Sequence, residues 1–182
     1  MESYFDLGSH SRLITTASAD AQLWFNRGLN WLYGFNHPEA VACFQRAAVC
    51  DPACAMAHWG IALAKGPYIN KQWSYYSERE LRETLDVCYH MARRAQRLGA
   101  PGTPSERGLL NALVERYQSP EPQELTELAR WNDARKLHAP AGGVCVMRAF
   151  RVQWRWHTTP TIAATTGASS SMQVMDVGGV FA

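Results

Sequence analysis

An alternation of small and bulky side chains at fixed spacing is the feature that most constrains the fold of this chain. Small residues let two helices approach closely, and bulky residues fill the space between them and the next pair. A proline near the start of the following helix is well tolerated, because its missing N–H would have no helical partner there. The pattern therefore predicts antiparallel pairs of helices. Its seven positions, separated by 4, 3, 9, 4, 3 and 5 residues, are Trp24, Gly28, Trp31, Ala40, Phe44, Ala47 and Pro52.

The first two-thirds of the chain reads as six amphipathic helices with clear start and stop signals. Serine, threonine, asparagine and aspartate before a helix accept hydrogen bonds from its first free N–H groups, and glycine is typical of helix ends. An all-α fold is therefore predicted. The start signals are Ser18, Pro38, Asp51-Pro52, Ser77-Glu80, Thr103-Glu106 and Gln123. The glycines expected at helix ends are Gly34, Gly66 and Gly99.

The spacing over residues 21–54 resembles the tetratricopeptide repeat (TPR). Over about residues 8–134 the chain also resembles a group of microbial and fungal TPR proteins of poorly defined role. This resemblance implies a right-handed α-solenoid of antiparallel helical hairpins. About three hairpins would occupy residues 18–134, the last incomplete, behind an N-terminal extension at 1–17. The residues that carry it are Ile14-Thr15-Thr16, Leu32-Tyr33-Gly34-Phe35-Asn36-His37, Asp51-Pro52 and Trp59-Gly60-Ile61-Ala62-Leu63-Ala64.

The same resemblance implies a non-enzymatic scaffold that binds a protein or peptide on a concave face. Repeat positions on the first helix of each hairpin would line this face, and its apolar members would suit an apolar or amphipathic segment. Phe25 and Leu29 stand where chaperone-tail-binding members carry Lys and Asn, which argues against a carboxylate clamp. A second interpretation is that these side chains pack against the N-terminal extension or a later helix. The expected binding residues are Gln22, Phe25, Asn26, Leu29, Leu32, Met56, Trp59 and Leu63.

A hypothesis of a different class is a metal-binding or enzymatic protein that uses Cys50, Cys54 and His58. Cys54 and His58 are four residues apart and share a helix face, and zinc accepts both residue types. Their spacing matches none of the usual zinc patterns, and cysteine is also a common small core residue. We therefore expect no catalytic residues, no bound metal and no cofactor.

Composition limits the compartment and the partners. The 182 residues are 47% hydrophobic, which is enough for a core, and no stretch approaches a membrane span. Without a secretory signal or a disulfide framework among the five cysteines, a cytoplasmic location is expected. Neither a membrane nor a nucleic acid is expected as a partner.

The composition changes after residue 134. Residues 1–134 carry a net charge of −2, whereas residues 135–182 carry +4 with a single acidic group, Asp176. The helical pattern stops there, and the segment is rich in serine, threonine and glycine. We interpret residues 135–182 as an irregular tail, with the hypothesis that a shifted or mispredicted reading frame produced it. A third hypothesis for the chain is accordingly a truncated fragment of a longer TPR protein.

Overall fold

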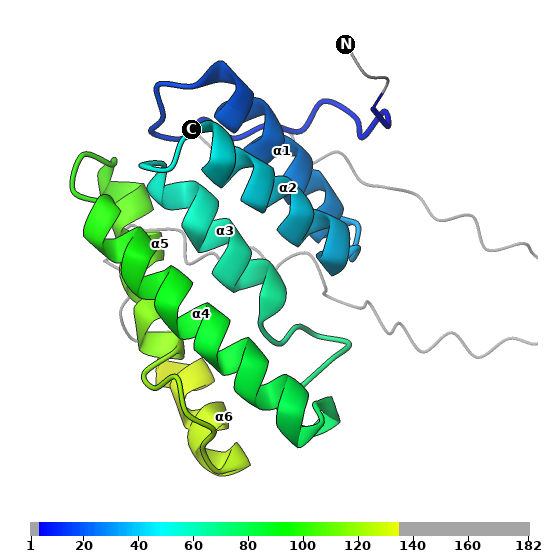
Figure 1. Ribbon diagram of the computed structural model, residues 1–182, viewed down its shortest axis with the longest axis vertical. Coiled ribbons are helices and arrows are strands. Elements are labelled where there is room, and N and C mark those ends of the chain that lie inside the picture. The colour runs from blue at the N-terminus through cyan, green and yellow to red at the C-terminus, as the bar shows by residue number, and fades with distance from the viewer. Residues whose placement is uncertain (1–3, 135–182) are drawn as a thin grey trace, which may run out of the picture.

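The computed structural model describes residues 4–134, and over this range the protein is all-α, as predicted (Figure 1). No strand is formed within these residues, although Tyr68 and Lys71 make one isolated β-bridge. The predictions made for residues 135–182 lie outside the described residues. The elements are α1 (Ala19–Tyr33), α2 (His37–Cys50), α3 (Ala55–Lys65), the short 3-10 helix η1 (Trp73–Tyr75), α4 (Glu78–Leu98), α5 (Pro104–Arg116) and α6 (Leu125–Ala134).

The expected capping residues begin three of the helices. The side chain of Ser18 accepts a hydrogen bond from the Ala21 N–H at the start of α1. Thr103 and Glu106 form a complete capping box at the start of α5. At α4 the box is only half formed, because Ser77 caps the helix while the Glu80 carboxylate pairs with Lys71.

The start of α3 differs from the prediction. Asp51 ends α2, and Pro52 lies in the turn that follows it instead of in the first turn of a helix. The Cys54 N–H donates to the Asp51 carbonyl oxygen at 3.0 Å, and α3 begins only at Ala55. A tight turn thus replaces the expected first turn of the helix.

The aromatic ring of Phe44 joins the first three helices. A Cβ atom placed on Gly28 of α1 would lie 2.6 Å from Cε1 of Phe44, and one placed on Gly60 of α3 would lie 2.5 Å from its Cδ1. Both distances are shorter than van der Waals contact, so the ring fits only because neither glycine has a side chain. Phe44 and Ala40 are fully buried, and the contact at Gly28 shows the close approach that the spacing predicts for α1 and α2.

Helices that follow one another in the chain pack against one another, from α1 with α2 through to α5 with α6 (Figure 1). Contacts of α1 with α3 and of α3 with α5 place α3 near the centre. One hydrophobic core runs from Ile14, ahead of α1, to Trp131 in α6. No helix among residues 4–134 is long and apolar enough to cross a membrane.

Candidate functional site

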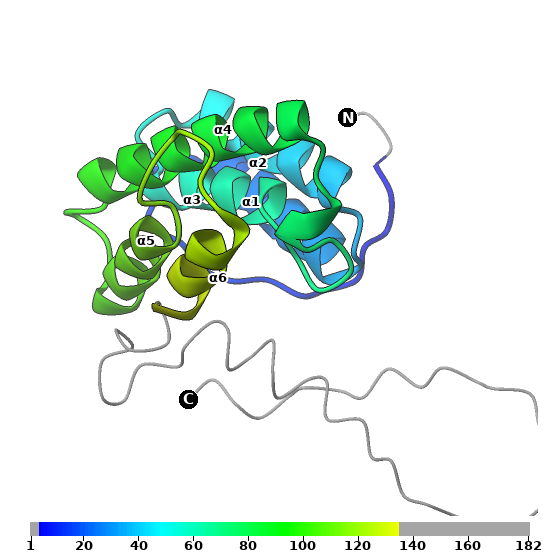
Figure 2. The same ribbon diagram turned by 90° about the horizontal axis from the view of Figure 1, so that it is seen from below.

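The N-terminal segment, residues 10–16, lies along α1, extended over residues 10–14 and bent at Thr15, and amide side chains hold it there. Gln22 and Asn26 are four residues apart, so they point to the same side of the helix. The Arg12 N–H donates to Oδ1 of Asn26 at 3.1 Å, and the Ile14 N–H donates to Oε1 of Gln22 at 3.0 Å. Figure 2 shows the segment crossing the underside of the helices toward α5. We call Gln22, Asn26 and Asn30 the amide ladder.

The amide ladder also donates to the carbonyl groups of this segment. Nε2 of Gln22 donates to the Arg12 carbonyl oxygen at 2.8 Å, and Nδ2 of Asn30 donates to that of His10 at 3.0 Å. The ladder therefore contacts the backbone of alternate segment residues, and it makes these contacts whatever side chains the segment carries.

The regular contact between the amide ladder and the segment follows from the rise per residue of a helix and of an extended chain. Four residues of an α-helix rise about 6.0 Å, and two residues of an extended chain advance about 6.6 Å. These two lengths are similar. Residues four apart on α1 can therefore contact every second residue of a segment that runs in the opposite direction. Any peptide in the same extended conformation would meet the ladder in the same way.

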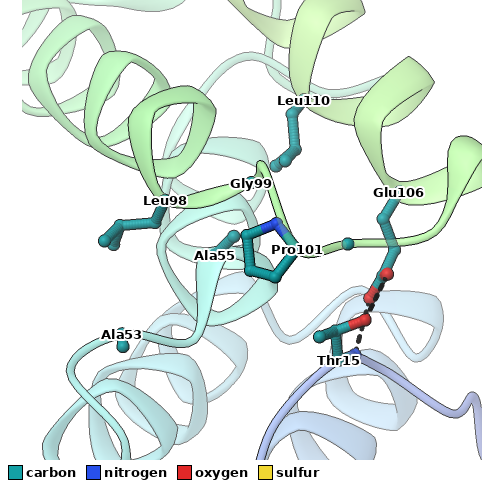
Figure 3. Close-up of a pocket in the computed structure, with 9 residues that line it drawn as sticks. Thr15, Ala53, Ala55, Leu98, Gly99, Pro101, Glu106 and Leu110 are labelled. Atoms are coloured by element: carbon teal, nitrogen blue, oxygen red, sulfur yellow. Dashed lines mark hydrogen bonds between the residues drawn. The ribbon is translucent and has the colours of Figure 1, made fainter.

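The far end of the segment is fixed to α5 by a buried carboxylate. Oε1 of Glu106 accepts the Thr15 N–H at 2.7 Å, and Oε2 accepts the Thr15 hydroxyl at 2.7 Å (Figure 3). Oε2 also accepts the Thr103 N–H at 2.7 Å within the capping box. Burial by itself would raise the pKa of Glu106, but the hydrogen bonds from Thr15 and Thr103 outweigh burial and hold its pKa below the ordinary value.

Tyr4, ahead of the segment, packs on a different side of α1. The Tyr4 hydroxyl accepts a hydrogen bond from the Trp31 indole N–H at 2.8 Å, and the Arg27 guanidinium lies 4.1 Å from the Tyr4 ring centroid. The guanidinium groups of Arg27 and Arg46 each lie 4.5 Å from the Trp24 ring centroid. Trp24 and Trp31 therefore pack against Tyr4 and Phe5, whereas their spacing predicted that they fill the space between hairpins.

Most residues of the expected concave face are buried in this structure. Of its eight residues, Gln22 and Asn26 hold the N-terminal segment, and Leu63 is half-buried. The remaining five are core residues with exposed fractions of at most 5%: Phe25, Leu29, Leu32, Met56 and Trp59. These five side chains belong to the hydrophobic core and stabilise the fold.

Asn30, Thr15 and Glu106 were not among the expected binding residues. Asn30 continues the four-residue spacing of Gln22 and Asn26, so the sequence contains a signal for it. Glu106 was expected only as a capping residue, and its second role depends on a contact with a residue 91 positions earlier in the chain.

A small pocket lies beside the Thr15–Glu106 contact, where residues 53–55 meet the loop before α5 (Figure 3). Its volume is about 20 Å³, which is room for about one water molecule. The pocket is therefore far too small for an organic substrate.

The metal-binding hypothesis finds no support in the arrangement of its three residues. Cys50 is exposed, and Cys54 is buried at the start of α3, where burial raises the pKa of its thiol. Nε2 of His58 lies 3.0 Å from the Pro52 carbonyl oxygen, and burial lowers the pKa of this ring. Within residues 4–134 no three His, Cys, Asp or Glu side chains gather closely enough to hold a metal ion.

The described geometry defines a helical protein with an extended segment bound along one helix. Comparison with protein-family models, with curated proteins and with solved structures gave no match for the chain. A functional proposal therefore rests on the geometry and on the repeat-like spacing alone.

Proposed function

We propose that the protein is a non-enzymatic interaction scaffold of TPR-like hairpins, arranged as a right-handed α-solenoid, that binds an extended peptide segment of a partner protein along α1. The observation that carries the proposal is the amide ladder, which already binds an extended backbone through both its N–H and its carbonyl groups. The seven-position spacing of residues 24–52 supports the repeat assignment.

Binding of a partner in this way requires exchange with the chain's own segment. The segment is joined directly to α1, so its effective concentration at the ladder is on the order of millimolar, as for a short linker. A partner peptide must therefore bind more favourably than the segment, or act when the segment has been released. The binding site is then the ladder and Glu106, in place of the buried residues of the expected groove.

The proposal includes a cytoplasmic location and a protein partner, with neither a membrane nor a nucleic acid involved. It is supported by the four described cysteines, Cys43, Cys50, Cys54 and Cys88, which are all free thiols. A reducing compartment is where free thiols are maintained.

Selection from a displayed library of random peptides tests this function. Selected peptides should bind the purified Ile14→Asp chain, in which a charge in the core releases the chain's own segment. Adding Asn26→Ala and Asn30→Ala to this chain should weaken binding at least about tenfold, because each lost hydrogen bond contributes about 0.5–1.5 kcal/mol. Asn111→Ala is the matched control, since Asn111 is an exposed amide on α5 that contacts Gln96. Failure to select any peptide, or equal binding by all three proteins, would contradict the proposal.

A further inference from the structure

We propose that the partner peptide carries an apolar residue followed directly by threonine or serine, and that residues 10–16 compete with it for the amide ladder. This inference rests on the proposed function. The chemistry of the partner peptide is inferred from the contacts of residues 10–16, the segment that occupies the site in this structure.

The apolar requirement follows from the contrast between two neighbouring side chains of the segment. Ile14 is only 9% exposed and belongs to the hydrophobic core, whereas Leu13 is 90% exposed. Successive side chains of an extended chain point to opposite sides, and the ladder holds the Ile14 N–H against Gln22. A peptide bound in the same register must therefore place one apolar side chain where Ile14 lies.

The hydroxyl requirement follows from Glu106. Its carboxylate accepts both the backbone N–H and the side-chain hydroxyl of Thr15, and the residue is 3% exposed. A valine at this position would leave a buried oxygen without one of its donors, which is costly. An acidic residue or a phosphorylated threonine would place a second negative charge against Glu106, so the site would reject both.

Displacement of the chain's own segment is feasible, because little of it is buried. Ser11, Leu13 and Thr15 are exposed, and between residues 10 and 16 Ile14 alone belongs to the core. Segments with few buried apolar contacts open at a lower free energy than global unfolding. Residues 10–16 can therefore leave the ladder while the helices stay folded.

The test uses the full chain and a fluorescent synthetic peptide with the sequence of residues 8–17. Ile14→Asp releases the segment, because it places a charge in the hydrophobic core, and Leu13→Asp is the matched control at an exposed position. We expect the peptide to bind the Ile14→Asp protein at least about tenfold more tightly than the wild type or the control. Thr15→Pro provides a second released protein, since proline removes both the N–H and the hydroxyl that bind Glu106.

Altered peptides then separate the inference from the proposed function. Peptides with Thr15→Ser should bind nearly as well as the original, whereas peptides with Thr15→Val or Thr15→Glu should bind at least about tenfold more weakly, as for loss of a hydrogen bond to a charged group. Equal binding of all four peptides to the released protein would overturn the inference and leave the proposed function intact. Absence of binding by every peptide, with both released proteins folded by circular dichroism, would overturn both.

Discussion

Replacing Glu106 by glutamine tests how strongly the N-terminal segment is fixed to α5. An amide keeps one acceptor oxygen and turns the other position into a donor. If the amide nitrogen takes the place of Oε2, it faces the Thr103 N–H, and if it takes the place of Oε1, it faces the Thr15 N–H. In either orientation one backbone N–H loses its acceptor.

The expected cost follows from these contacts. A hydrogen bond to a charged group contributes about 1.5–3 kcal/mol, and a buried donor left unpaired adds about 1 kcal/mol more. We therefore expect Glu106→Gln to lower the free energy of unfolding by about 2–4 kcal/mol, measured by urea denaturation of the full chain. The same substitution should also speed hydrogen exchange at the Thr15 amide.

Glu83→Gln is the matched control. Glu83 lies on α4 with 63% of its side chain exposed, and its carboxylate is 3.7 Å from Nε of Arg79. Exposed pairs of this kind contribute about 0–1 kcal/mol, so this variant should be nearly neutral. If Glu106→Gln were as mild as Glu83→Gln, the assigned role of the buried carboxylate would be wrong.

Two further predictions concern the core and the buried histidines. Gly28→Ala should destabilise the protein by about 1–3 kcal/mol in urea denaturation, because its Cβ would overlap Phe44, whereas Gly108→Ala, whose Cβ meets no atom within 4 Å, should be neutral or stabilise by up to about 1 kcal/mol. Equal effects of the two substitutions would argue against the tight packing of α1 on Phe44. Burial lowers the folded-state pKa of His37 and of His58, so the unfolded chain takes up more protons as the pH falls below 6.5. The free energy of unfolding, measured by urea denaturation, should therefore be lower at about pH 5.5 than at about pH 7.5, and a higher value at the acid pH would contradict the assignment.

The sequence predicted the helices well because their signals are local. Ser18 and Thr103 cap their helices as expected, and the spacing of Gly28 and Phe44 reflects a contact that the structure contains. The predicted start of α3 was wrong, because Asp51-Pro52 is compatible with a turn as well as with the start of a helix.

The site was only partly predictable. Gln22 and Asn26 were expected on a binding face, and they do bind a peptide segment, but that segment belongs to the chain itself. Repeat positions indicate which side of a helix a residue occupies, yet they do not indicate what covers that side. The contact of Thr15 with Glu106 joins distant parts of the chain and has no local signature, so only the folded structure reveals it.

Residue-resolved hydrogen exchange of the full chain tests most directly whether α1 binds an extended backbone. The amides of Arg12, Ile14 and Thr15 donate to side chains of the helical body, whereas the Leu13 amide has no acceptor among residues 4–134. We predict slow exchange at the first three and fast exchange at Leu13, with the slow amides of Arg12 and Ile14 becoming fast in the double variant Gln22→Ala, Asn26→Ala. Uniformly fast exchange across residues 10–16 in the wild-type chain would contradict the account.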